Sequence, residues 1–544
     1  MTPTPQVLIA GAGPVGLTLA IDLAGRGIRV TIVEPRAPGE PPSVKCNHVG
    51  ARTMEIFRRL GIVKSIRAAG LPDDYPNDCA FRTTTVGLEL SRIPIPCRTE
   101  RYTANGGPDT WWPTPEPPHR INQIFLEPIL FDHAKAQRNI RIINRVRLTD
   151  FTQDAAGIRV TIQNLDTGEQ TRMDAQYLIG CDGAHSTVRR RIGATLTGDA
   201  VLEHRQSTYI RAPQLLGAIT TKPAWANTSL NPRRSANMFA IDGRQTWLIH
   251  NYMRPGETFD SVDREWCIRQ ILGVGPSFPF EIITKEDWTA RRMIADRFRD
   301  RRVFLCGDAA HIWVPNAGYG MNAGIADAMN LSWMLAAVLN GWAGLAILDA
   351  YEAERQPITE QVSHYAMNTS LALAQQRSAI PDNIEDPTPE GEASRRRIGQ
   401  EAHDINVGQF CCGGLNFGYF YDNSPLIAYD GEQHPAYTID DFRQSTVPGC
   451  RTPHIWLRGG DSLYDQLGPE FTLLRFDRSA DVDGILTAAR RRSVPMKLLD
   501  CEPDKAAYEE TLVLSRPDQH VAWRGNTPPA DPLRLIDKIR SASI

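Results

Sequence analysis

The feature that most constrains the fold is a glycine-rich motif near the start of the chain. A short apolar run, Val7–Ala10, leads directly into Gly11-x-Gly13-x-x-Gly16. The first glycine permits a tight turn from strand to helix, the second lets the backbone approach a pyrophosphate, and the third lets the helix pack closely on the strand. The phosphates of a bound dinucleotide would then lie at the positive N-terminus of that helix.

The residues after the motif complete a strand, helix and strand unit. Apolar residues with helical spacing run from Pro14 to Arg26, and a β-branched run from Arg29 to Val33 ends at Glu34. Glu34 follows the first glycine at about the 20-residue interval expected for a carboxylate that binds the ribose hydroxyls of an adenosine. We therefore predict an α/β fold with a Rossmann-like unit. The residues predicted to bind the dinucleotide are Gly11, Gly13, Pro14, Gly16 and Glu34.

Length and composition set the outer limits. A chain of 544 residues with 42% hydrophobic and 23% charged side chains predicts a globular protein of two or three domains. A net charge of −3 gives no reason to expect nucleic acid or a membrane surface as a partner. The ten cysteines contain no CxxC pair or zinc-like spacing, and no secretory signal is apparent, so we expect a cytoplasmic protein without a metal site.

One segment reaches the lower limit for a membrane-spanning helix. Leu331–Leu348 carries no charge over 18 residues. The Asn340-Gly341 pair inside it is a helix-stop signal. Two shorter buried helices joined by a tight turn are therefore the expected structure.

Two further motifs lie far downstream of the first. A strand-like run, Tyr177–Gly180, leads into Cys181-Asp182-Gly183, and a second run, Arg302–Leu305, leads into Cys306-Gly307-Asp308. Taken alone, an Asp-Gly pair after a strand is an ordinary turn. Together with the glycine motif, in this order, they resemble the "DG" and "GD" motifs of the class A flavoprotein monooxygenases, the FAD-dependent aromatic hydroxylases.

The resemblance implies a set of FAD contacts. Asp182 would lie near the FAD pyrophosphate and the route of NAD(P)H, and Asp308 would bind the ribityl chain. Two segments that resemble the family's, around Arg52 and Gln123, would place these side chains on FAD. The stretch after the third motif would bring a helix N-terminus to the flavin N1–C2 edge, where reduced flavin carries negative charge. Its predicted contacts are Pro315, Gly318, Gly320, Met321 and Asn322.

The same stretch departs from the family pattern at three places. Val314 stands in place of the first residue of the usual Pro-Pro, and Ala317 in place of the first residue of the usual Gly-Gly. Met334 stands where a lysine is common. These changes would alter the loop beside the flavin but leave the predicted FAD contacts in place.

The resemblance also implies a domain layout. A discontinuous FAD-binding domain would be interleaved with a β-sheet substrate domain and followed by a thioredoxin-like C-terminal domain, as in phenol 2-hydroxylase-like and 3-(3-hydroxyphenyl)propionate hydroxylase-like enzymes. Because the C-terminal domain lacks CxxC, we expect a structural role for it, with homodimer formation as a candidate. The predicted ranges are 1–80, 110–195 and 285–375 for the FAD-binding domain, 81–109 and 196–284 for the substrate sheet, 376–403 for a linker or surface excursion, and 404–544 for the C-terminal domain.

By the same resemblance, the chain is an enzyme that uses NAD(P)H and O2 to hydroxylate a phenolic substrate through a flavin C4a-hydroperoxide. A base near the flavin would deprotonate the phenol, and Asn47 and His48 occupy the position where some relatives carry an acid or a histidine. A structural histidine is an equal alternative for His48. The candidates for an apolar pocket are Trp111, Trp112, Tyr252 and Trp313.

Other functions stay open at this point. An enzyme of the same fold could use the flavin for epoxidation or Baeyer–Villiger oxidation of a larger polycyclic substrate. A non-catalytic flavin-binding protein is the alternative from a different class. The Trp-x-Trp-x-Ile-Pro motif of flavin halogenases is absent, since the chain reads Asp109-Thr110-Trp111-Trp112-Pro113.

Overall fold

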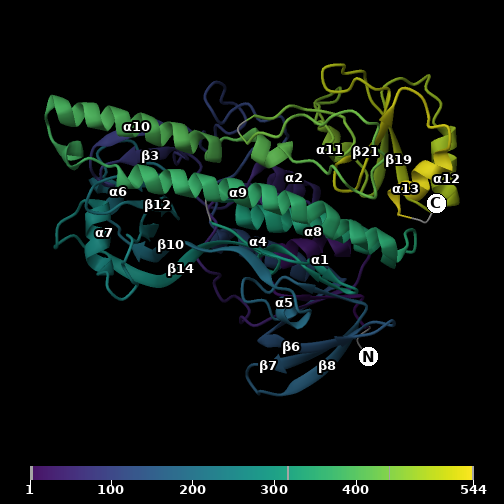
Figure 1. The fold of residues 1–544 in the computed structure, drawn as a ribbon, viewed down its shortest axis with the longest axis horizontal. Helices are drawn as coiled ribbons and strands as arrows, with labels where there is room; N and C mark the ends of the chain where they lie inside the picture. Colours follow the sequence, from purple (N-terminus) through teal and green to yellow (C-terminus); the bar gives the residue numbers. More distant parts are fainter. Residues whose placement is uncertain (1–3, 315–317, 440, 542–544) are drawn as a thin grey trace.

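The computed structural model describes residues 4–314, 318–439 and 441–541, which form three sheet-centred parts (Figure 1). The first part is a six-stranded sheet in the order β15-β16-β9-β1-β2-β5, in which all neighbours except β15 and β16 are parallel. Helix α1 packs against both α4 and α8. The bounds are β1 Val7–Ala10, β2 Val30–Glu34, β5 Ile140–Asn144, β9 Tyr177–Gly180, β15 Arg299–Asp300, β16 Val303–Leu305, α1 Pro14–Gly25, α4 Gln123–Ala136 and α8 Tyr319–Leu339.

A three-stranded antiparallel sheet extends from one end of this part (Figure 1). Its strands are β6 Val146–Gln153, β7 Ile158–Asn164 and β8 Gln170–Ala175. The strands between residues 140 and 164 therefore belong to two sheets, since β5 is part of the six-stranded one. The shorter helices nearby are α2 Ala51–Arg59, α3 Val63–Ala68 and α5 Thr187–Arg191.

The second part is an eight-stranded sheet in the order β17-β14-β10-β13-β12-β11-β3-β4. A turn at Asp242-Gly243 joins β12 to β13: Gly243 has a φ of +67°, and Asp242 Oδ1 accepts three backbone N–H bonds across the turn. The bounds are β3 Cys79–Arg82, β4 Glu89–Ile93, β10 Leu196–Arg211, β11 Ala226–Ser229, β12 Ala236–Ala240, β13 Thr246–Tyr252, β14 Glu281–Ala295, β17 His311–Ile312, α6 Leu215–Ala218 and α7 Arg264–Leu272.

Two long helices, α9 (Ala350–Ser378) and α10 (Pro389–Phe410), cover one face of the eight-stranded sheet (Figure 1). Ser363 of α9 accepts a hydrogen bond from Arg292 of β14 at 3.1 Å, and the Gly399 carbonyl of α10 accepts one from Ser91 of β4 at 2.6 Å. We call this side the inner face. Because side chains alternate along a strand, it carries Arg205, Ser207, Phe239, His250 and Trp288. Helix α7 packs on the opposite face.

Two of the predicted boundaries are wrong. The expectation of a linker over 376–403 fails because α10 is helical from Pro389, with the Thr388 hydroxyl accepting the Gly391 N–H at the helix start. Its Ile398 and Ala402 are buried in the core of the eight-stranded sheet. The boundary at 285 falls inside β14, which pairs with β10 up to Ala295.

The helix in the apolar stretch after the third motif ends at the predicted helix-stop signal. Helix α8 stops at Leu339, and Gly341 has a φ of +80°. A 3₁₀ turn, η3 (Leu345–Asp349), stands in place of the second expected helix. No helix in the described part of the chain combines the length and the apolar character needed to cross a membrane.

The C-terminal part is a four-stranded sheet in the order β19-β18-β20-β21, with β18 and β19 parallel and the other pairs antiparallel. An isolated bridge from Trp456 to Ser462 lies before α11. Cys450 and Cys501 are free thiols. The thioredoxin-like assignment stays a prediction. The bounds are η4 Asp382–Glu385, a π-helical turn η5 Gly414–Gly418, α11 Leu463–Gln466, β18 Phe471–Arg475, α12 Asp483–Arg491, β19 Met496–Asp500, β20 Leu512–Ser515, β21 Val521–Gly525 and α13 Pro532–Ile539.

Candidate functional site

The three sequence motifs meet at one edge of the six-stranded sheet. Strand β1 lies between β2 and β9, and β9 lies beside β16, all in parallel register. The carboxyl ends of these four strands therefore share an edge. The turns that follow them carry Gly11, Asp182 and Asp308, and Glu34 ends β2. Open α/β sheets bind their ligands at this edge.

The three glycines of the first motif meet different surroundings. Gly11 has a φ of +105°, and a Cβ added there would lie 2.3 Å from the Cys181 carbonyl oxygen. A Cβ on Gly16 would lie 2.1 Å from the Gly11 oxygen. Gly13 has an ordinary φ of −73°, and a Cβ there would meet nothing within 4 Å. The fold itself therefore requires Gly11 and Gly16, whereas Gly13 borders open space at the start of α1, as a pyrophosphate cradle would.

Glu34 anchors a chain of polar contacts that ends at Gln123. Its carboxylate accepts the Ala12 N–H at 2.6 Å and the Arg36 Nε–H at 2.9 Å. Arg36 also pairs with Glu127 at 2.5 Å, and Glu127 accepts the side-chain amide of Gln123 at 2.9 Å. Two residues predicted to contact the dinucleotide are thus joined through Arg36. Sequence reasoning missed Arg36 because a single arginine in a turn has no periodic signal.

Asp182 holds the second motif in place and keeps one oxygen available. Its Oδ2 accepts the N–H groups of Thr187 and Val188 at 2.7 and 3.1 Å, at the start of α5. Its Oδ1 is buried and has no hydrogen-bond partner in the part of the chain that the structure describes. Arg189 donates to the Ala309 carbonyl at 2.9 Å, which fixes this motif beside the third one.

Asp308 projects from a turn whose neighbours are buried. Gly307 and Ala309 are buried, whereas the Asp308 side chain is exposed. The protein around the carboxylate nevertheless raises its pKa through desolvation, against the opposing charges of His311 and Lys45. A carboxylate that points into open space at a strand end suits hydrogen bonds from ligand hydroxyls.

Asp327 holds the turn around Asp308 in place through hydrogen bonds. It accepts the Gly307 N–H at 3.2 Å, His311 Nε2 at 2.7 Å and Arg355 Nε at 2.8 Å. Burial opposes its ionisation, but the charges of His311 and Arg355 outweigh burial and lower its pKa to about 2. A permanently charged Asp327 therefore fixes the backbone on either side of Asp308.

The N-terminus of α8 lies against the segment that holds the predicted base. Gly318 has a φ of +63°, and a Cβ there would lie 3.2 Å from the His48 Cβ. Asn322 donates to the Gly318 and His48 carbonyls at 2.7 and 3.2 Å and accepts the Gly50 N–H at 2.8 Å. A Cβ on Gly320 would meet nothing within 4 Å. His48, which is 4% exposed, thus lies beside the predicted flavin edge.

The other predicted residues of this region have mixed outcomes. Asn47 accepts the Asn122 side-chain amide at 2.5 Å, so its oxygen serves to join two loops. Met321 is buried, and its backbone contacts the Cys46 thiol, whose pKa burial raises to about 12. Pro315 lies outside the described residues.

Arg52, a predicted FAD contact, is bound by protein groups in this structure. Its guanidinium pairs with Glu55 at 2.8 Å, donates to the Asp518 carbonyl at 2.7 Å and contacts Gln519. Glu55 in turn pairs with Arg451. Arg52 therefore links α2 to the C-terminal part, and its contact with FAD stays a prediction.

An aromatic row crosses the inner face of the eight-stranded sheet, and sequence reasoning did not identify it. The ring centroids of Phe410 and Trp225 are 5.8 Å apart, those of Trp225 and Phe239 5.2 Å, those of Phe239 and His250 5.9 Å, and those of His250 and Trp288 6.1 Å. All except Trp225 are partly exposed, although α9 and α10 cover this face. The inner face therefore presents partly exposed aromatic rings beneath these helices.

The row is fixed at one end by a hydrogen-bonded chain. Ser207 Oγ accepts the Trp288 indole N–H at 2.6 Å and lies 2.6 Å from His250 Nδ1. Burial and the charge of Arg205 lower the pKa of His250 to about 3, so its ring is neutral. Glu286 lies two residues before Trp288 on β14 and pairs with Lys45. The charge of Lys45 also acts to lower the pKa of Asp308. Lys45 therefore connects β14 of the eight-stranded sheet electrostatically with the turn of the third motif.

Of the four aromatic residues proposed for a pocket, only Tyr252 lies in this row's surroundings. Its ring lies between the guanidinium groups of Arg205 and Arg377, at 4.5 and 3.7 Å. Trp313 stacks on His311 at 4.7 Å. Trp111 is 43% exposed and stacks on Trp112, whose ring meets the edge of Phe417.

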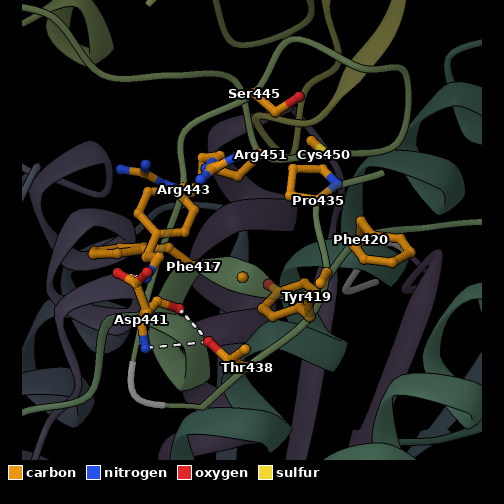
Figure 2. Close-up of a pocket in the computed structure, with 13 residues that line it drawn as sticks. Phe417, Tyr419, Phe420, Pro435, Thr438, Asp441, Arg443, Ser445, Cys450 and Arg451 are labelled. Atoms are coloured by element: carbon orange, nitrogen blue, oxygen red, sulfur yellow. Dashed lines mark hydrogen bonds between the residues drawn. The ribbon is translucent and has the colours of Figure 1, made fainter. Parts of the chain in front are cut away.

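A separate small cavity lies between η5 and the segment 435–451 (Figure 2). Figure 2 shows Arg451 and Phe417 at its wall, with the guanidinium 4.1 Å from the ring centre. None of the residues of the three motifs lines this cavity. It belongs to the junction with the C-terminal part.

Comparisons with known proteins agree with this arrangement. Residues 4–366 match the family described as "FAD binding domain", and residues 445–540 match "Aromatic-ring hydroxylase, C-terminal". The FAD-dependent monooxygenase apdD of Emericella nidulans is 31% identical over 96% of this chain and 87% of its own length. The phenol 2-monooxygenase of a Pseudomonas species is 30% identical over 97% and 91%. The solved structure of the rebeccamycin biosynthetic enzyme RebC with reduced flavin is 33% identical, covers 99% of both chains and has a TM-score of 0.89.

Proposed function

Because the chain belongs to the FAD-dependent monooxygenases that carry an aromatic-ring hydroxylase C-terminal domain, we propose that it hydroxylates a phenolic ring with NAD(P)H and O2. The observation that carries this proposal is the aromatic row on the inner face, whose Trp288 lies two residues from Glu286, the ion-pair partner of Lys45. A flat aromatic ligand on that row would lie between the sheet and the N-terminus of α8.

The residues present fit FAD. The open space beside Gly13 and the N-terminus of α1 would receive the pyrophosphate, and Glu34 would receive the ribose hydroxyls. The exposed carboxylate of Asp308 would accept hydrogen bonds from the ribityl hydroxyls. The N-terminus of α8 at Gly320 would stabilise negative charge at the flavin edge. When bound, FAD supplies the redox chemistry that activates O2.

The protein's own contribution is to hold the ring, exclude water and remove a proton. Burial of His48 against Gly318 supports its role as the base that takes the proton of the phenol hydroxyl. Loss of that proton enriches the ring carbons ortho and para to the oxygen, which makes them better nucleophiles. The neutral His250, held by Ser207, would orient the ring through its second nitrogen.

A two-stage experiment tests the proposal. Anaerobic NADH or NADPH should bleach the bound flavin, and one of a panel of phenols should accelerate NAD(P)H oxidation with one hydroxylated product per NAD(P)H, identified by mass spectrometry. Flavin that is not reduced would favour a non-catalytic flavin-binding protein. Turnover that yields only hydrogen peroxide across the panel would contradict the phenolic substrate.

A further inference from the structure

The aromatic row ends at two arginines whose surroundings differ. At one end, Arg205 lies over the ring of Trp288 at 5.0 Å and pairs with Glu203 at 2.7 Å. Glu203 also pairs with Arg377. Each of the two guanidinium groups at this end therefore has a carboxylate partner within the protein.

At the other end, Arg120 lies over the ring of Trp225 at 4.7 Å and is only 3% exposed. Its one hydrogen bond is from Nη2 to the Phe410 carbonyl at 3.3 Å. Its Nε and Nη1 are buried and have no hydrogen-bond partner among residues 4–314, 318–439 and 441–541, and no carboxylate in those ranges forms an ion pair with it. The carboxylate of Asp109 is already paired with Arg101 at 2.5 Å.

A buried guanidinium whose N–H groups lack acceptors is unfavourable unless a ligand supplies those acceptors. Buried arginines are almost always paired, because removal of the charge from water is costly. The planar fork of N–H groups matches a carboxylate, which can accept two parallel hydrogen bonds. Arg120 follows His119, whose backbone forms an antiparallel bridge with Val49. Val49 is next to the predicted base, His48, so Arg120 belongs to a segment that also borders the predicted flavin edge.

We propose that Arg120 binds an anionic group of the aromatic substrate, which makes the substrate an aromatic acid rather than a neutral phenol. The carboxylate would accept two parallel hydrogen bonds from the Nη1–H and Nη2–H fork of Arg120, while the ring system lies along Trp225, Phe239 and His250. This inference rests on the proposed aromatic hydroxylase function. It adds the charge of the substrate and the residue that recognises it.

A purely structural role is the alternative that the test must separate. Arg120 could serve only to join α10 to the sheet through the Phe410 carbonyl and the Trp225 ring, with a buried water on its remaining N–H groups. In that case the Arg120→Gln variant would lose stability but would show no change in the relative affinity for acids and amides.

The experiment measures binding to the FAD-loaded protein with pairs of probes of nearly the same shape. The pairs are salicylate with salicylamide, and 3-hydroxy-2-naphthoate with 3-hydroxy-2-naphthamide, followed through the flavin absorbance and the tryptophan fluorescence. The wild-type protein should bind at least one acid about tenfold or more tightly than its amide. Arg120→Gln should remove that preference by weakening the acid and leaving the amide unchanged.

Two further variants complete the design. Arg120→Lys keeps the charge without the fork and should retain part of the preference, which covers the case in which Arg120→Gln does not fold. Arg141→Gln removes an exposed charge of β5 and should retain all of it. The proposal is overturned if the wild type shows no preference for either acid, or if the preference persists without Arg120.

Binding needs no turnover, so this result stands apart from the test of the enzyme activity. Hydroxylation of neutral phenols without any preference for acids would overturn the role of Arg120 and leave the proposed function intact. An Arg120-dependent preference for acids, in a protein whose flavin NAD(P)H does not reduce, would support the role of Arg120 and contradict the proposed function.

Discussion

Arg516 and Glu354 form an ion pair with two parallel hydrogen bonds, of 2.7 and 2.8 Å, and both side chains are completely buried. Arg516 follows β20 of the C-terminal part, and Glu354 lies in the first turns of α9, the helix that covers the inner face of the eight-stranded sheet. Asp518 and Ser424 add further bonds to the same two side chains. The C-terminal part is thereby bonded to α9, the helix that covers the inner face on which the substrate is proposed to bind.

Arg516→Met should destabilise the protein by about 3–5 kcal/mol, because it leaves Glu354 as a buried charge without its main partner. Urea denaturation followed by fluorescence measures the change. Arg159→Met, which breaks an exposed pair with Asp174, is the matched control and should change the free energy of unfolding far less, because water already solvates both charges. Equal effects of the two variants would mean that burial of the first pair has no energetic consequence.

Arg52→Gln separates the two roles considered for that residue. Because the guanidinium binds Glu55 and the backbone of Asp518, we expect a loss of about 1–3 kcal/mol and faster proteolysis of the C-terminal part. The ratio of FAD to protein should stay at the wild-type value. A variant that loses FAD but keeps wild-type resistance to protease would support the role of an FAD contact.

Gly13→Val and Gly16→Ala should fail in opposite ways. Gly13 has an ordinary backbone conformation and open space beside it, so the apoprotein should keep its thermal stability while FAD binding is lost. The Gly16 substitution would place a methyl group 2.1 Å from a backbone oxygen and should cost about 1–3 kcal/mol in the apoprotein. Melting temperatures of both apoproteins and flavin absorbance after FAD addition give the comparison. FAD binding by Gly13→Val would show that no phosphate approaches this turn.

His48→Asn should slow hydroxylation by a factor of roughly 10²–10⁴ and divert reduced flavin to hydrogen peroxide, because the phenol keeps its proton. The FAD content should not change. Since the phenol loses its own proton at high pH, the rate of the variant should recover as pH rises toward about 10. Rapid kinetics with the phenol selected from the panel measure both effects. Full coupling of the variant near neutral pH would exclude His48 as the base.

Asp327 predicts a pH dependence whose sign follows from its lowered pKa. His311 and Arg355 hold the folded-state pKa at about 2, below the ordinary value of 3.8, so the carboxylate stabilises the fold above pH 3.8 and loses this effect as pH falls toward 2. The wild type should lose about 1 kcal/mol from this group between pH 5 and pH 3. Asp327→Asn should be less stable at pH 5, and the difference should shrink by that amount at pH 3. A constant difference would show that Asp327 does not titrate as its surroundings require.

The local parts of the fold were predictable, and the parts built from distant segments were not. Gly11, Gly16 and the Asp242-Gly243 turn act through their immediate neighbours, so their patterns predict their structure. Helix α10 was missed because three prolines and many polar residues precede or begin it, and Pro389 is in fact its first residue.

The site shows the same division. The turns with Asp182 and Asp308 follow from motifs in a known order. The chain from Trp288 through Ser207 to His250 joins three strands, Ser207 and His250 are 43 positions apart in the sequence, and no spacing in the sequence specifies that register. Arg120 has one neighbour in sequence with a predicted role, Gln123, but its own environment is made by Trp225 and Phe410.

The interleaving of the two large sheets determines when the flavin site can exist during synthesis. Strands β1, β2, β5 and β9 emerge from the ribosome early, whereas β16 and Asp308 follow only after most of the eight-stranded sheet has been made. A nascent chain that ends before β16 exposes the edge of β9 and lacks the helix that carries Gly318. With FAD bound as proposed, at Asp308 and the N-terminus of α8, only chains in which both sheets are complete would hold the cofactor, and its capture would come late in folding.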